Sequence, residues 1–182
     1  YQAVSGSGKD GVEELLQQSS AYIDQRSIDK KVYPKQIAFN SIPFVDCFLE
    51  NNYTREEMKM VWETHKILDE NISVNPTAVR VPVLVGHAES IYIETEKEID
   101  IELAKNCLND FAGISVIDDV QEVDFPTSFE HGHGTDDVYV GRIRKGLTKN
   151  NSLNLWVVAD NVRKGAALNS IQIAENLVGS EM

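Results

Sequence analysis

Cysteine is scarce in this chain, and its placement excludes two common classes of small protein. Only Cys47 and Cys107 occur among the 182 residues, so there is no disulfide framework and no cysteine-based zinc motif. Both lie in apolar surroundings without a basic neighbour that would favour a thiolate, and we expect both to be small buried hydrophobes. His131 and His133 lack a carboxylate or cysteine at a familiar ligand spacing. They therefore predict a flexible surface loop and no metal site.

Basic residues and long apolar runs are also scarce. The 17 Lys and Arg residues face 29 Asp and Glu residues, a formal net charge of −12, which argues against nucleic acid or an anionic membrane as a partner. An anionic substrate must therefore be held by a local basic cluster. No apolar run approaches the ~20 residues that span a bilayer. The polar, glycine-rich start shows no secretory signal, and we expect a reducing cytoplasm.

The hydrophobic patterning predicts one α+β domain over residues 1–182, long enough to bury a core. A capping box at 54–57 marks one helix start most clearly. Strands separated by loops and helices favour a mixed, largely antiparallel sheet with helices on one face. The expected helices are 9–24, 54–68, 102–111 and 161–178, and the expected strands are 36–42, 78–85, 89–96, 114–117, 138–144 and 153–158, with a loop at 121–136. The segments 78–85 and 89–96 are either two strands or one long strand kinked at Gly86.

A fixed cation and a histidine lie seven residues apart in the stretch RVPVLVGH, as Arg80 and His87. An arginine can hold a carboxylate through two parallel hydrogen bonds, and a histidine can transfer protons near neutral pH. The pair predicts a site for a small carboxylate-bearing substrate. Two structural alternatives stay open: a half-buried, satisfied histidine, and an arginine paired with Glu89 or Glu94 across a hairpin. Because seven is odd, strict strand alternation would also place the two on opposite faces unless Pro82 or Gly86 interrupts it.

Two weaker patterns accompany this pair. Glu56 and Lys59 share a helix face, either as a solvated ion pair or as a split anchor for an amine and a phosphate. The same spacing recurs at Glu63 and Lys66, so spacing alone does not decide between these readings. The Ser-Gly-Ser-Gly turn at 5–8 could approach a cofactor closely, but it matches neither a Rossmann nor a P-loop motif.

Several stretches together are specific to one family. They are 1–8 (YQAVSGSG), 38–43 (AFNSIP), 53–68 (YTREEMKMVWETHKIL), 79–90 (VRVPVLVGHAES), 140–144 (VGRIR) and 153–167 (LNLWVVADNVRKGAA). In these, the chain resembles the C-terminal half of aspartate-semialdehyde dehydrogenases, almost end to end and in the same order. The loop at 121–136 is the least typical part, and no functional role transfers to it.

The resemblance implies a fold, a reaction and a set of site residues. The fold is that of the C-terminal domain of glyceraldehyde-3-phosphate dehydrogenase, an α+β domain that binds substrate and dimerises. The reaction interconverts L-aspartyl 4-phosphate and L-aspartate 4-semialdehyde with NADP, on the way to lysine, methionine and threonine. The implied roles are acid/base catalysis for His87, the substrate carboxylate for Arg80, the substrate amine for Glu56, phosphate for Lys59, substrate orientation for Gln2, and cofactor contact for Ser5, Gly6 and Asn161.

The resemblance also implies that two parts of the enzyme lie upstream of residue 1. These are the cysteine nucleophile and the NADP-binding Rossmann domain, so we expect the 182 residues alone to be inactive and the full protein, a homodimer or homotetramer, to be the enzyme. We expect the helix at 161–178 to pack on the missing domain and to leave an apolar patch exposed here. Two alternatives remain: a reductase resembling N-acetyl-glutamyl-phosphate reductase, and a non-catalytic dimerisation module. Glu56 favours a free amine over an acetylated one.

Overall fold

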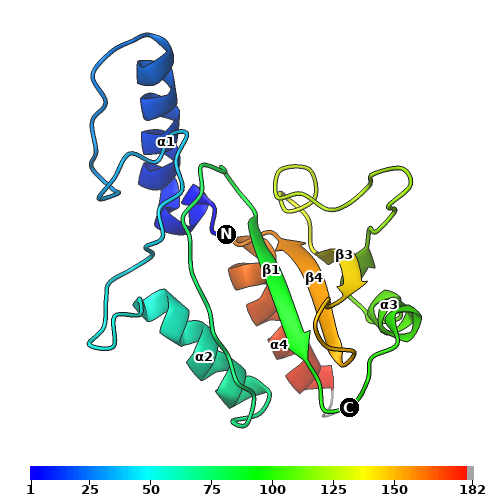
Figure 1. Ribbon diagram of the computed structural model, residues 1–182. Helices are drawn as coiled ribbons and strands as arrows, with labels where there is room; N and C mark the ends of the chain where they lie inside the picture. Colours follow the sequence, from blue (N-terminus) through cyan, green and yellow to red (C-terminus); the bar gives the residue numbers. More distant parts are fainter. Residues whose placement is uncertain (180–182) are drawn as a thin grey trace. The chain divides into compact units, whose positions relative to one another are not determined.

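The computed structural model describes residues 1–179 and divides into two compact units, Tyr1–Pro82 and a second from Val83 onward. Figure 1 shows the order of the elements along the chain. Each unit is built differently, the first from helices and ordered coil and the second around a sheet. That the chain serves as a single substrate-binding and dimerisation domain stays a prediction.

The first unit contains a short 3₁₀ turn, η1 (Val4–Ser7), followed by the helices α1 (Gly8–Ile23) and α2 (Arg55–Ile67). The predicted capping box at the start of α2 is confirmed. The side chain of Thr54 accepts the Glu57 N–H at 3.2 Å, and the Glu57 carboxylate accepts the Thr54 N–H at 2.7 Å. These reciprocal bonds satisfy two amide groups that would otherwise lack helical partners, and they fix where α2 begins.

Two strands predicted in this unit do not form. Residues 36–42 are coil, buried at Ile37, Ala38 and Ile42 and exposed at 39–41, because the amides of Ile37 and Ala38 donate to the side chain of Gln18 on α1 instead of to a neighbouring strand. Residues 78–85 are coil as well, and only Arg80 forms β-bridges, to Gln2 and Ile42. A short apolar run shows that a segment is buried but does not distinguish a strand from ordered coil.

The second unit is a four-stranded sheet of order β1-β4-β3-β2, with bounds β1 (His87–Glu94), β2 (Ile114–Val116), β3 (Val138–Lys145) and β4 (Ser152–Ala159). β4 pairs antiparallel with β1 and β3, whereas β2 pairs parallel with β3. The predicted hairpin of β3 and β4 is confirmed, as is the mixed, largely antiparallel sheet. The strand predicted at 89–96 lies two residues earlier.

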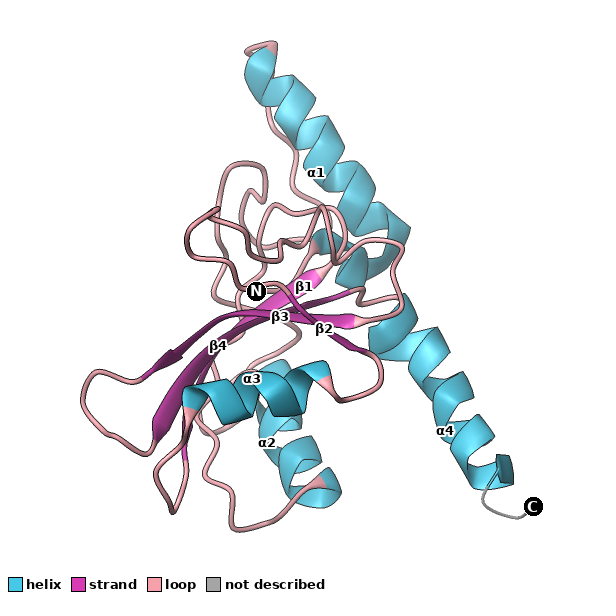
Figure 2. Ribbon diagram, turned by 90° about the vertical axis from the view of Figure 1, so that its right-hand side faces the viewer, coloured by secondary structure: helices cyan, strands magenta, loops and turns pink. Residues whose placement is uncertain are grey.

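One face of this sheet packs on helix α3 (Ile101–Asn109), and α3 and α4 lie on the same side of it (Figure 2). Val140, Ile143 and Leu153 form the buried cluster of this face. Its other members are partly buried apolar residues of α3 and the strands, among them Ile101, Ala104, Leu108, Leu155 and Val157. The alternate positions of β4 contact the loop at 126–136 instead, since the Trp156 indole N–H donates to the Pro126 carbonyl oxygen at 3.0 Å.

The last helical region differs from the prediction at its start. A single helix was expected from residue 161, but residues Arg163–Ala167 form a π-helical turn, η2, and α4 runs from Leu168 to Gly179. The wider turn shows in its hydrogen bonds, which join Gly165 N to Asp160 O and Ala167 N to Val162 O, each spanning five residues. α4 exposes more than half of Ile171, Ile173, Leu177 and Val178. Among the described residues, no helix is long and apolar enough to cross a membrane.

Candidate functional site

Arg80 lies at a junction of three segments of the first unit. Its amide and carbonyl groups exchange hydrogen bonds with Ile42 at 2.8 and 2.9 Å. On the other side, Gln2 bonds to the neighbours of Arg80, through Gln2 N to Val79 O at 2.8 Å and Val81 N to Gln2 O at 3.0 Å. The backbone therefore brings together Gln2 and Arg80, two candidate residues that are far apart in the sequence.

The Arg80 side chain is held in place by burial. The residue is 5% exposed, and its Nη1 donates to the carbonyl oxygen of Ala3 at 2.7 Å. Burial lowers the pKa of the Arg80 guanidinium, while Tyr33 and Glu56 act in the opposite direction. A guanidinium stays charged at neutral pH even so. The unit thus holds a buried, oriented cation, which is the first requirement for gripping a carboxylate.

Glu56 and Lys59 form the second part of the cluster. Gln2 Nε2 donates to Glu56 Oε1 at 2.7 Å, and Lys59 Nζ donates to Glu56 Oε2 at 3.1 Å. Burial acts to raise the pKa of Glu56, but the bonds from Gln2 and Lys59 and the charge of Arg80 outweigh it and lower the pKa. The pKa of Lys59 is raised, chiefly by its bond to Glu56. Both groups are therefore ionised at neutral pH.

The Glu56–Lys59 pair is more than a solvated helix pair. The Glu56 side chain is only 23% exposed, and it is also bound by Gln2, 54 positions away in the sequence. Glu63 and Lys66, which repeat the spacing, are both exposed. Lys59 and Arg80 are the cations that act on Glu56 here, and they are the groups of this cluster that can bind an anionic ligand in an acidic chain.

Ser5 and Gly6 belong to the η1 turn of the same unit. Gly6 is exposed and Ser5 is half-buried, and the turn is closed by the bond from Gly6 N to Ala3 O at 3.1 Å. An exposed glycine in a fixed turn allows a flat ring to approach the backbone closely. The cofactor contact of Ser5 and Gly6 stays a prediction.

His87 and Asn161 lie in the second unit, at one end of the sheet. His87 begins β1 and is paired with Ala159, the last residue of β4. Asn161 follows two positions later, and its Oδ1 accepts the amide of Gly86, the residue before His87, at 3.0 Å. Residues 81–86 form no strand and Gly86 has φ +90. The alternation that would have set Arg80 and His87 on opposite faces therefore does not apply.

Other candidates take structural roles. Glu94, proposed as an alternative partner for Arg80, binds Lys149 Nζ at 2.6 Å. His131 accepts the Thr127 amide at its Nδ1 at 3.1 Å and packs on Tyr139 with ring centroids 5.4 Å apart. The expectation of two buried cysteines is wrong for Cys107, which is exposed on α3 outside the row of residues that packs on the sheet, and Cys47 is only half-buried.

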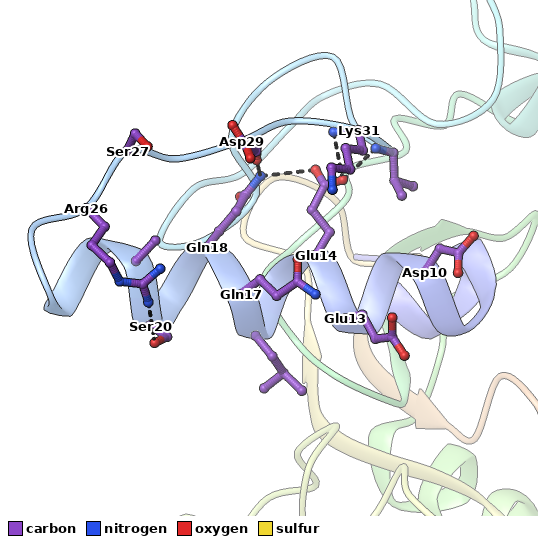
Figure 3. Close-up of a pocket in the computed structure, with 13 residues that line it drawn as sticks. Asp10, Glu13, Glu14, Gln17, Gln18, Ser20, Arg26, Ser27, Asp29 and Lys31 are labelled. Carbon is purple, nitrogen blue, oxygen red and sulfur yellow. Dashed lines mark hydrogen bonds between the residues drawn. The ribbon is translucent and has the colours of Figure 1, made fainter.

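A pocket of about 740 Å³ lies between α1 and the segment 26–32 (Figure 3). None of the candidate residues lines it. Four carboxylates face it, from Asp10, Glu13, Glu14 and Asp29, against Arg26 and Lys31. Glu14 and Gln18 are used there to hold the backbone of the following segment, as the dashed bonds of Figure 3 show. Its lining suits an anionic substrate poorly.

Comparison with known proteins gives a consistent assignment. Residues 1–164 match the family model described as semialdehyde dehydrogenase, dimerisation domain. An aspartate-semialdehyde dehydrogenase of Shewanella sp. (strain DB6705) is 55% identical over 179 residues, which are 98% of this chain and 52% of that protein. The chain thus spans about half the length of the curated relatives it matches.

Solved structures agree with the sequence relatives. Aspartate semialdehyde dehydrogenase II of Vibrio cholerae, complexed with ASA, has a TM-score of 0.95 and 49% identity, covering 100% of this chain and 54% of that one. The enzyme of Candida albicans with NADP has a TM-score of 0.63 and 25% identity, covering 78% of this chain and 45% of that one. The α+β fold predicted from the sequence is confirmed.

Proposed function

Because the chain belongs to the semialdehyde dehydrogenase family, whose dimerisation domain it matches over residues 1–164, we propose that the full-length protein interconverts L-aspartyl 4-phosphate and L-aspartate 4-semialdehyde with NADP. These residues would supply substrate binding, acid/base catalysis and dimerisation. The observation that carries the proposal is the hydrogen-bonded series Gln2–Glu56–Lys59 beside the buried Arg80. The product would feed lysine, methionine and threonine synthesis.

Each group of the cluster matches one group of the substrate. The guanidinium of Arg80 suits the α-carboxylate, and the ionised Glu56 suits a free ammonium group. Lys59 retains donors for a phosphate, since an ammonium group has three and one is given to Glu56. The ionised state of Glu56 favours a free amine over the acetylated amine of an N-acetyl-glutamyl-phosphate reductase.

His87 would act as the general acid/base. It would give a proton to the substrate's carbonyl oxygen when the carbonyl carbon is attacked, and take it back when the carbonyl group forms again. The nucleophile is expected to be a cysteine thiolate outside residues 1–182. NADP, when bound, supplies the redox equivalent. Ser5 and Gly6 would contact the cofactor through an exposed turn, and Asn161 through its amide at the end of β4.

We further propose that the protein assembles as a homodimer or homotetramer in the cytoplasm. The apolar side chains that α4 exposes, Ile171, Ile173, Leu177 and Val178, would be covered by the nucleotide-binding domain that the family resemblance predicts. Exposed apolar side chains grouped on one helix are typical of a surface that a partner covers.

The test is an assay of the full-length protein for phosphate-dependent reduction of NADP with aspartate semialdehyde. We expect Glu56→Gln to lower kcat/KM by about 10- to 100-fold, because a charge-assisted hydrogen bond contributes about 1.5–3 kcal/mol. Glu63→Gln changes the same residue type on the same helix, at an exposed position. That control should retain activity within about twofold, as expected for an exposed surface charge.

Three outcomes would overturn the proposal. An inactive wild-type protein would favour a non-catalytic dimerisation module. Activity confined to an N-acetylated semialdehyde would favour the related reductase. Equal effects of Glu56→Gln and Glu63→Gln would show that the cluster in the first unit does not bind the substrate.

A further inference from the structure

The residue before His87 is fixed against one loop. Gly86 has φ +90, and a Cβ on it would lie 2.5 Å from Ser128 O and 2.6 Å from Gly132 O. Only glycine tolerates both the backbone conformation and the contact. The start of β1, and with it the backbone of His87, therefore rests on the backbone of the 126–136 loop.

The same loop is tied to the end of β4 by a buried carboxylate. Asp160 is 2% exposed, and its Oδ2 accepts the amide of Gly134 at 2.7 Å. Its Oδ1 accepts the amides of Val162 and Arg163, each at 2.8 Å. One side chain thus holds the 126–136 loop on one oxygen and the start of the η2 turn on the other.

These attachments form a closed series of contacts that includes Gly86, the residue before His87. The loop contacts Gly86, Asp160 holds the loop, and Asn161 follows Asp160 directly. Asn161 then returns to the start, because its Oδ1 accepts the Gly86 amide at 3.0 Å. Every contact of the series lies within the second unit. The two candidate residues of that unit are therefore positioned by one shared support.

We propose that Asp160 is a positioning residue for His87 and Asn161, acting through the 126–136 loop. The proposal rests on the proposed function of His87. It needs a carboxylate at position 160, because all three groups facing its two oxygens are N–H donors, from Gly134, Val162 and Arg163. An asparagine would offer one oxygen and turn an NH₂ group toward a donor.

The 126–136 loop could support His87 even though its sequence is the least typical of the family. The loop presents backbone atoms, not side chains, to Gly86 and Asp160, through Ser128 O, Gly132 O and Gly134 N. Its internal bonds keep these atoms in place, among them His131 N to Thr127 O at 3.0 Å. A loop that supports Gly86 and Asp160 through backbone atoms can change its side chains and still provide that support.

The experiment compares Asp160→Asn with Asp136→Asn in the full-length protein. Asp136 lies in the same loop and also binds the η2 turn, but its ion pair with Arg163 is exposed. We expect Asp160→Asn to lower kcat by about 10- to 100-fold, because displacing a catalytic group by about 1 Å can reduce the rate 100-fold. KM should change by less than about threefold, since the proposed substrate anchors lie in the first unit. Asp136→Asn should change both by less than about twofold.

A second variant distinguishes loss of the Asp160 contact from a failure of the protein to fold. Asp160→Ser keeps an oxygen that can cap the η2 turn but is too short to hold Gly134 as well, and serine is among the best capping residues. It should show the same fall in kcat. Unchanged kcat in folded Asp160→Asn and Asp160→Ser would overturn the inference, and so would a rise in KM as large as the fall in kcat. An inactive wild type, or a fully active His87→Gln, would instead overturn the proposed function.

Discussion

Glu14 offers a test of how the first unit is ordered. The residue is 6% exposed, and its carboxylate accepts several hydrogen bonds, most of them from the segment after α1. Oε2 accepts the amides of Lys31 and Val32, and Oε1 accepts Gln18 Nε2 at 3.0 Å and the Tyr33 amide at 3.4 Å. Replacement by glutamine keeps the size of the side chain but turns an NH₂ group toward two donors, whichever way the amide is oriented.

The expected cost follows from which donors lose their acceptor. A buried donor left unsatisfied costs about 1–3 kcal/mol. The amides of Lys31 and Val32 belong to exposed residues and can turn to water, whereas the Tyr33 amide is buried. The glutamine should therefore place its NH₂ group toward Lys31 and Val32. We expect a local destabilisation of about 1–3 kcal/mol, the cost of one unsatisfied buried donor, because the NH₂ group of a glutamine at this buried position would face donors and find no acceptor.

Hydrogen exchange measured by mass spectrometry on the peptide covering 29–38 is the suitable assay, because opening of this segment is local. A cost of 1–3 kcal/mol corresponds to exchange about 5 to 150 times faster, at 1.36 kcal/mol per tenfold change. Glu13→Gln, one residue earlier on α1, removes only an exposed pair with Lys9 at 3.3 Å and should leave the peptide unchanged. Equal exchange in Glu14→Gln and wild type would refute the assignment of Glu14 as the anchor of this segment.

Two further predictions concern the cysteines and low pH. Cys47→Ser and Cys107→Ser should each leave activity of the full-length protein within about twofold, as for other substitutions outside the site, whereas loss of activity in either would place the nucleophile inside this chain. The pKa of Asp160 lies below its ordinary value of 3.8, because the amides of Arg163, Gly134 and Val162, together with the charge of His133, outweigh the opposing effect of burial. Its contribution to stability is therefore complete above pH 3.8 and is lost as the pH falls through the folded-state pKa. The Gly134 amide proton, followed by NMR, should shift only below pH 3.8, and a midpoint above that value would contradict the contact.

The sequence predicted the elements whose signals are local. The capping box at 54–57 located the start of α2, and the alternating runs at 138–144 and 153–158 located a hairpin that the structure confirms. The sequence-based prediction was wrong where side chains from elsewhere in the chain, and not a neighbouring strand, bind the backbone amides. The apolar residues at 36–42 suggested a strand, but their amides are bound by Gln18, a side chain 19 and 20 positions away from Ile37 and Ala38.

The candidate site was also predictable only where its signals lie in the local sequence. Spacing alone gave Arg80 and His87 as a pair, and the resemblance added Gln2, Glu56 and Lys59, which the structure joins in hydrogen bonds with one another. No pattern in the sequence could have revealed the contact of Gly86 with the 126–136 loop, because it depends on two backbones meeting. Asp160 did carry a signal, as a capping residue ahead of a helix. Its second bond, to Gly134, could only be seen in the structure.

Under the proposed function, the groups of the first unit would be oriented before the substrate binds. Glu56 uses two of about four acceptor positions, for Gln2 and Lys59. Under the proposed function, an incoming ammonium group could therefore bind without displacing either donor. Because Arg80 is already desolvated and oriented by Ala3 O at 2.7 Å, much of the cost of ordering that cation precedes binding. A Gln2→Ala variant bears on this preorganisation, since it removes the bond to Glu56 but no charge. Under the proposed function its main effect should therefore be on KM, while Lys59→Ala, which removes a cation, should also weaken the response to phosphate concentration.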